Sequence, residues 1–106
     1  MKRVSHIMGP ADAVQEASLT AMISVDGFHC AVARSGDTAY AVGDVCPHQN
    51  APLHGAPVSE GHVTCLKHCY RFDLRSGDCL TVGGYGLPIY PARIEGGLVV
   101  VDNWED

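Results

Sequence analysis

The sequence predicts an all-β fold, a small antiparallel barrel or sandwich, from three observations. Short segments in which apolar and polar residues alternate recur along the chain. Turns that contain glycine separate these segments at close spacing, as is typical of small all-β domains. A single short segment, 10–17, has helical character, with Pro10 near the position that suits a first turn.

The expected strands follow one another as hairpins. Residues 21–25 alternate with the period of a half-buried strand, and 28–32 resume the alternation after Asp26-Gly27. An Asp-Gly pair between two such runs is a strong hairpin signal. The turn at 35–37 then leads into 38–43. The remaining expected strands are 57–59, 62–65, 70–74, 92–95 and 98–102.

Length and charge limit the classes of function. A chain of 106 residues fits one domain, 1–106. With 7 basic and 12 acidic residues its formal net charge is −5, which argues against nucleic acid as a partner. Nothing approaches the roughly 18–20 apolar residues of a membrane span, and polar residues interrupt any signal-like apolar segment near the N-terminus. We therefore expect a cytoplasmic protein with no membrane partner.

The cysteines favour metal ligation over disulfides. There are five of them, an odd number in a chain without an export signal, which makes a disulfide framework a poor interpretation. Thiolates that bind a metal are the better hypothesis. Cys30 and Cys79 fit no ligand spacing, and we expect both to be small buried residues.

Two segments pair a cysteine with a histidine. Cys46-Pro47-His48 and Cys65-Leu66-Lys67-His68 form a C-x-H and a C-x-x-H motif with 16 residues between them. Two thiolates suit ferric iron, and two neutral imidazoles on a second iron make an electron easier to add. Such mixed ligation raises the potential to roughly −150 to +300 mV, against about −400 mV for all-cysteine plant-type clusters.

Two other interpretations of these motifs stay open. A mononuclear zinc site uses the same Cys2His2 ligand set, although zinc motifs usually place both cysteines together. The four residues could also bind no metal at all. Two Cys-His pairs, each in a loop punctuated by Pro or Gly, make this last interpretation the weakest.

The run from Cys46 to Gly77 resembles the cluster-binding half of Rieske-type ferredoxins, the electron-transfer components of multicomponent ring-hydroxylating oxygenases. Leu53 matches an apolar position after the first loop, and Phe72, Asp73 and Gly77 match an F-D-x-x-x-G tail. A later strand motif also matches, at Leu87, Tyr90, Pro91, Arg93 and Ile94.

The resemblance implies a fold and a site. Cys46 and Cys65 would hold the inner iron of a [2Fe-2S] cluster, and His48 and His68 the outer iron. The fold would be the Rieske iron–sulfur protein fold, with antiparallel sheets that form a base (1–43 and 87–106) and an inserted cluster-binding subdomain (44–86).

The resemblance also implies a function. The chain would carry single electrons from an NAD(P)H-dependent flavoprotein reductase to a terminal oxygenase of aromatic hydrocarbon catabolism. It would have no catalytic residues and no small-molecule substrate, and would not be an enzyme by itself. The alternatives are a Rieske-fold subunit of another redox enzyme, such as a nitrite reductase small subunit, and the Rieske domain of an oxygenase α subunit.

Departures from the family pattern add expectations. Ala51 and Lys67 stand where high-potential Rieske proteins have a disulfide, and Phe72 lacks a tyrosine hydroxyl, so we expect a potential near the low end of the range. Cys69 replaces the usual glycine after the second histidine, and we expect it to be packed, the alternative being a reactive thiol near the cluster. We expect Trp104 to pack on the base, and His54 to be an exposed residue of the first loop.

Overall fold

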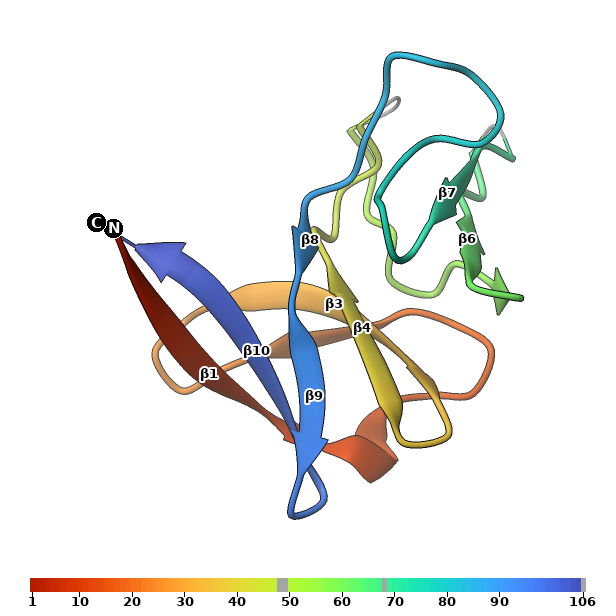
Figure 1. Cartoon of the computed structure of the whole chain (residues 1–106). Helices are drawn as coiled ribbons and strands as arrows, with labels where there is room; N and C mark the ends of the chain where they lie inside the picture. The colour runs from red at the N-terminus through yellow and green to blue at the C-terminus, as the bar shows by residue number, and fades with distance from the viewer. Residues whose placement is uncertain (48–49, 68, 106) are drawn as a thin grey trace.

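The computed structural model describes residues 1–47, 50–67 and 69–105, which form ten strands and one 3-10 turn (Figure 1). The strands form three antiparallel sheets. The all-β prediction is therefore confirmed.

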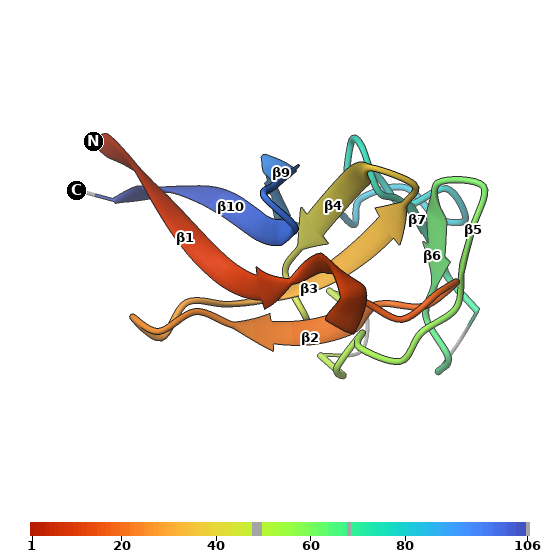
Figure 2. The ribbon, with the colours of Figure 1, turned by 90° about the horizontal axis from the view of Figure 1, so that it is seen from below.

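The first sheet joins the two ends of the chain. Its strand order is β1 (Lys2–Pro10), β10 (Leu98–Glu105) and β9 (Ala92–Glu95). β1 and β10 pair along almost their whole length, so the N- and C-termini lie side by side and extend away from the rest of the molecule (Figure 2).

The second sheet has the order β2–β3–β4–β8, with β2 spanning Thr20–Ile23, β3 His29–Ser35, β4 Thr38–Val42 and β8 Ile89–Tyr90. The hairpins predicted around Asp26-Gly27 and at 35–37 are both present. A buried apolar core lies between this sheet and the first; it includes Met8, Met22, Cys30, Val32, Ala41, Val99 and Val101.

The third sheet is small and lies in a separate lobe at the opposite end of the molecule from the termini (Figures 1 and 2). It has the order β5 (Val58–Ser59), β6 (His62–Thr64), β7 (Arg71–Asp73). A second core connects this lobe to the base; it includes Leu19, Val42, Leu53, Val63, Phe72 and Leu74.

A buried carboxylate ties the first sheet together. Asp102 on β10 accepts a hydrogen bond from Ser5 Oγ on β1 at 2.6 Å, and Arg93 Nη1 on β9 lies 3.0 Å from Oδ2. Arg3 Nε adds an ion pair at 3.2 Å. The Ser5 hydroxyl, and then the Arg93 guanidinium, hold the pKa of Asp102 below its ordinary value.

The helix predicted at 10–17 is wrong. The chain forms only the 3-10 turn η1, Ala11–Ala13, between Pro10 and Val14, which are both extended. The Ala11 N–H donates to the Gly97 carbonyl at 2.8 Å instead of starting a helical ladder. Ala17 then takes a left-handed φ of 56°, which stops any further helical turn.

Two further expectations about the base are corrected. No strand was expected at residues 2–10, where the structure has β1, because the strand is specified by its partner at the other end of the chain. Trp104 does not pack on the base. It is opposite Arg3 in the β1–β10 pair and its side chain is exposed. Across the described ranges, no helix is long and apolar enough to span a membrane.

Candidate metal centre

The two cysteines of the paired motifs lie buried in two neighbouring loops. Cys46 follows β4 in the first loop, and Cys65 follows β6 directly in the second. Their exposed fractions are 0% and 2%, and both belong to the core that contains Leu53 and Phe72. The other two predicted ligands, His48 and His68, lie outside the described residues.

The first loop closes on Cys46 through its backbone. The Cys46 N–H donates to the Ala51 carbonyl at 2.7 Å, and the Asn50 N–H donates to the Cys46 carbonyl at 2.7 Å. The Asn50 backbone is left-handed, with φ of 55°. Asn tolerates this conformation better than most residues, because its short polar side chain can hydrogen-bond locally.

The second loop repeats this pattern around Cys65. The Cys65 N–H donates to the Tyr70 carbonyl at 2.8 Å, and the Cys69 N–H donates to the Cys65 carbonyl at 2.9 Å. Cys69 takes the left-handed conformation, with φ of 58°. Each cysteine is therefore fixed by the residues four and five positions after it, and the same turn presents both thiols.

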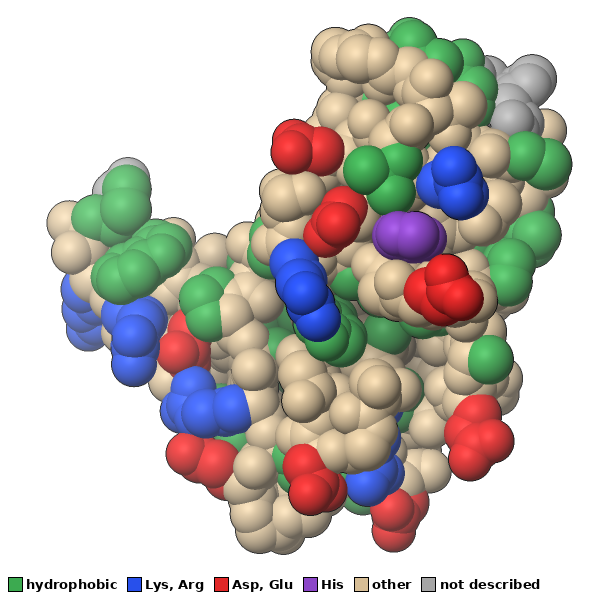
Figure 3. Space-filling model, turned by 45° about the vertical axis from the view of Figure 1, so that its right-hand side comes forward, with side chains coloured by type: hydrophobic (Ala, Val, Ile, Leu, Met, Phe, Trp, Pro, Cys, Tyr) green, Lys and Arg blue, Asp and Glu red, His purple; other side chains and the backbone are tan. Residues whose placement is uncertain are grey.

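The two thiols have buried apolar side chains around them and exposed residues next to them in sequence, which suits a metal centre bound near the surface. Leu53, Val63 and Phe72 are fully buried in the same core. Residues next to the cysteines in sequence are exposed, with Leu66 70% accessible and Val45 47%. Hydrophobic side chains also gather at the outer end of the lobe (Figure 3). This arrangement buries both sulfurs and leaves Val45 and Leu66 accessible beside them.

The described residues include two of the four expected ligands, Cys46 and Cys65. No disulfide joins the five cysteines, so both buried thiols can act as thiolate ligands. Within the described ranges, no group of three or more His, Cys, Asp and Glu side chains is placed to hold a metal ion. A Cys2His2 set would take its other two donors from His48 and His68, which lie outside that part of the chain.

Two expectations about cysteines are corrected here, and the expected exposure of His54 is confirmed. Cys69 is exposed, so it does not pack; its positive φ explains why a glycine suits the position. Cys79 is only partly buried, whereas Cys30 is buried as expected, and burial raises the pKa of Cys30 to about 12. His54 is half exposed, but its ring contacts Asp44, at 2.6 Å between Nδ1 and Oδ2, a contact that sequence spacing does not reveal.

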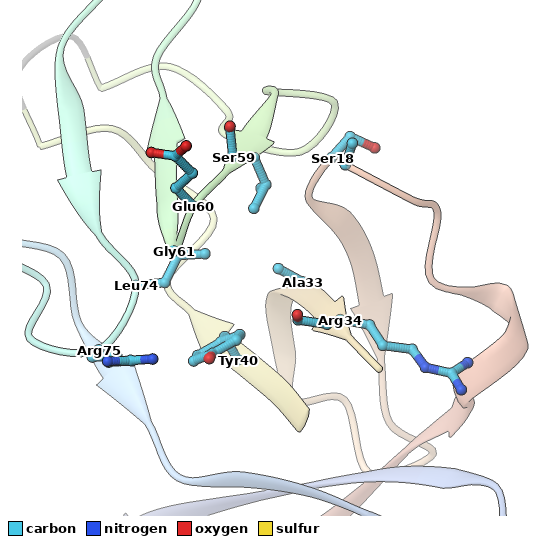
Figure 4. Close-up of a pocket in the computed structure, with 12 residues that line it drawn as sticks. Ser18, Ala33, Arg34, Tyr40, Ser59, Glu60, Gly61, Leu74 and Arg75 are labelled. Atoms are coloured by element: carbon cyan, nitrogen blue, oxygen red, sulfur yellow. The ribbon is translucent and has the colours of Figure 1, made fainter. Parts of the chain in front are cut away.

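A cavity of about 350 Å³ lies between the base and the lobe (Figure 4). Tyr40, Ala33 and Arg34 line it from the base, and Ser59, Leu74 and Arg75 line it from the lobe. Its lining includes no residue of the two cysteine loops. The cavity is therefore separate from the thiol site.

Sequence relatives share the region that contains this site. The family described as "Rieske [2Fe-2S] domain" matches residues 5–91. The anthranilate 1,2-dioxygenase ferredoxin subunit of Burkholderia cepacia is 36% identical over 74 residues, which is 68% of each chain. The p-cumate 2,3-dioxygenase ferredoxin component of Pseudomonas putida is 35% identical over 65 residues, 59% of this chain and 55% of that protein.

Solved structures agree with the fold. The ferredoxin of carbazole 1,9a-dioxygenase from Nocardioides aromaticivorans IC177 superposes with a TM-score of 0.77 at 28% identity, covering 95% of this chain and 97% of that one. A chain assigned as an NADH-dependent nitrite reductase small subunit from Mycobacterium tuberculosis superposes over 100% of both chains, with a TM-score of 0.87 at 24% identity. The chain belongs to the Rieske [2Fe-2S] domain family, and its cofactor is a Rieske-type [2Fe-2S] cluster.

Proposed function

We propose that this protein is a one-electron carrier in which Cys46 and Cys65 ligate one iron of the cluster and His48 and His68 the other. The observation that carries the proposal is the repeated turn that buries both thiols at the end of the lobe. When bound, a Rieske cluster supplies a one-electron couple in the range of roughly −150 to +300 mV.

The residues around the thiols adapt the site to electron transfer. Leu53 and Phe72 surround the sulfur side with buried apolar groups, which protects thiolate ligands from water. Phe72 has no hydroxyl to donate to a sulfur. Fewer hydrogen bonds to sulfur stabilise the reduced, more negative state less, so the potential lies near the low end of the Rieske range.

The partners are a flavoprotein reductase that oxidises NAD(P)H and a terminal ring-hydroxylating oxygenase. The ferredoxin names of the 36% and 35% identical relatives support this assignment. The exposed apolar residues Val45 and Leu66 beside the cysteines provide a surface for partners. The chain works in the cytoplasm as a component of aromatic hydrocarbon catabolism, with no active site of its own.

The domain division follows the sheets. The three strands of the third sheet and both cysteines fall within 44–86, which we assign as the cluster-binding subdomain. Residues 1–43 and 87–106 form the base. The two parts share the core that contains Val42, Leu53 and Leu87, which supports their assignment to one domain.

A nitrite reductase small subunit is the second candidate. The full-length superposition on the Mycobacterium tuberculosis chain favours it at the level of the fold. The presence of both cysteines and both histidines favours the electron carrier.

The experiment that tests the function compares two cysteine variants in electron transfer. Wild-type protein and Cys30→Ser are expected to hold iron and sulfide, to be reduced by a dioxygenase ferredoxin reductase with NADH, and to be reoxidised by its terminal oxygenase. Cys65→Ser is expected to lose the visible absorption and the transfer, because it removes a ligand, whereas the equally buried Cys30 is not one. A wild-type protein that holds iron and sulfide but exchanges no electrons with either partner would contradict the oxygenase assignment.

A further inference from the structure

Asp44 lies at the entrance to the first cysteine loop, where its carboxylate connects the two ends of the loop. Oδ1 accepts the backbone N–H groups of Leu53 at 3.0 Å and His54 at 2.6 Å. Oδ2 lies 2.6 Å from Nδ1 of the His54 ring. We call these three contacts the Asp44 clasp.

The clasp consists of strong contacts. A carboxylate only accepts hydrogen bonds, so this contact is a hydrogen bond when the His54 ring has its proton on Nδ1. Hydrogen bonds to an ionised acceptor are shorter and stronger than those between neutral groups. The side chain of Asp44 is 23% exposed and that of His54 50%, so solvent reaches the ring more than the carboxylate.

The two cysteine loops differ in what lies behind them. The second loop continues the β6–β7 pair, with Thr64 opposite Arg71 and Val63 opposite Phe72. β4 leads into the first loop, but it pairs with β3 and β8 and not with the returning segment of the loop.

Backbone pairing at the base of the first loop is therefore limited, in the described residues, to the bond from the Cys46 N–H to the Ala51 carbonyl at 2.7 Å and the bond from the Leu53 N–H to the Asp44 carbonyl at 3.2 Å. Val45 and Pro52 form an isolated bridge between these bonds, and Pro52 has no N–H to donate. The Asp44 clasp joins the two ends of the first loop, at the position where the β6–β7 pair joins the two ends of the second loop.

The geometry points to Asp44 and His54 as positioning residues for Cys46, which rests on the proposed role of Cys46 as a ligand. The clasp fixes the base of the first loop two residues before Cys46, and so fixes where this thiolate sits relative to the thiolate of Cys65. Neither side chain is proposed as a ligand. Their loss is expected to change the retention and the spectrum of the bound metal centre while both cores remain intact.

Three variants separate the contacts. Asp44→Ala removes all of them, and His54→Ala removes the imidazole contact alone. Asp44→Asn keeps an oxygen that accepts the two backbone N–H groups, so it is the conservative variant. Asp37→Ala removes an exposed turn aspartate, and Ser5→Ala removes a side-chain hydrogen bond to Asp102 in the base, so both serve as matched controls.

The experiment measures the release of metal from the loaded protein to a chelator, the EPR spectrum of the reduced protein and the hydrogen exchange of the Leu53 and His54 amides. Asp44→Ala is expected to release metal on the order of 10- to 100-fold faster, as when other outer partners of metal sites are lost. Its two amides should exchange faster and its EPR g-values should shift. His54→Ala and Asp44→Asn both lose the contact between the carboxylate and the imidazole, so both should fall between Asp44→Ala and wild type, and the controls should resemble wild type.

Wild-type release rates, g-values and amide exchange in Asp44→Ala would overturn the proposal. If Asp44→Ala does not fold, the rate of metal release from His54→Ala becomes the test. A release rate equal to that of wild type then overturns the proposal. Failure of the proposed function looks different, because the wild-type protein itself would then hold zinc instead of iron and sulfide. The amide exchange and the release of that zinc still test the clasp.

Discussion

Asn50 and Cys69 occupy equivalent places in the two cysteine loops. Each lies four residues after a buried cysteine, donates its N–H to the carbonyl of that cysteine, and has a left-handed backbone, with φ of 55° and 58°. The two loops thus use one turn geometry although their sequences differ. The residue at this position decides how much strain the turn carries.

Replacing Cys69 with glycine is expected to stabilise the protein. A left-handed conformation costs an L-residue other than Gly or Asn roughly 1–2 kcal/mol, part of which the flexibility of glycine in the unfolded chain offsets. Cys69→Gly should therefore raise the free energy of unfolding by about 0.5–1 kcal/mol, measured by urea denaturation. Asn50→Gly is the matched comparison and should gain less. A loss of stability in Cys69→Gly would contradict the strain argument.

Gly77 is expected to tolerate no side chain. Its φ is 81°, and an added Cβ would overlap the Leu87 carbonyl oxygen and lie 2.9 Å from Ile89 Cγ1. Gly36 also has a positive φ, 59°, but its Cβ would meet open space. Gly36→Ala should cost about 1 kcal/mol and Gly77→Ala clearly more, because backbone atoms must move. Equal losses in thermal unfolding would show that the contact with Leu87 does not matter.

The Asp102 network predicts a pH-dependent contribution to stability. The pKa of Asp102 is lowered in the folded state, so its carboxylate stabilises the fold above the ordinary value of 3.8 and loses this effect as the pH falls through the lowered value. Asp102→Ala should cost roughly 1.5–3 kcal/mol at pH 7, as for hydrogen bonds to charged groups. The difference in unfolding free energy from wild type should shrink below pH 3.8. A difference that is constant from pH 7 to pH 2 would contradict this.

The cysteines should differ in their reactivity toward iodoacetamide. Cys69 is exposed and should be modified first. Cys30 is buried and has its pKa raised to about 12, so almost no thiolate is present near pH 8 and it should react only on unfolding. Mass spectrometry of the folded protein after short labelling checks this order. Modification of Cys30 as fast as Cys69 would contradict the burial of β3.

Local signals in the sequence identified most of the hairpins. Asp26-Gly27 and Gly96-Gly97 sit at the turns that join the predicted strand pairs, because glycine supplies the positive φ that such turns require. The local pattern does not predict β1, because its pairing with β10 joins residues between 88 positions (Pro10 and Leu98) and 103 positions (Lys2 and Glu105) apart, and no local turn marks it. The 10–17 segment was misread because its proline starts a 3-10 turn that hydrogen-bonds to Gly97.

The sequence pattern predicts Cys46 and Cys65 as ligands, but it carries no information about the contacts around them. The spacing of Cys46 and Cys65 is a local signal of metal binding, and the family match supports it. The Asp44–His54 pair joins residues ten positions apart through side chains, and no periodicity encodes it. The burial of His6, which stacks on Phe28 with ring centroids 4.4 Å apart, likewise depends on packing between sheets.

The most direct test of the central claim is the EPR spectrum of the protein after reduction with dithionite, together with iron and acid-labile sulfide analysis. We expect two irons and two sulfides per chain, as a [2Fe-2S] cluster requires. We also expect a reduced signal whose average g is clearly below that of the free electron, as ligation of one iron by two imidazoles would give. A colourless, EPR-silent protein with stoichiometric zinc and no sulfide would contradict the electron-carrier function.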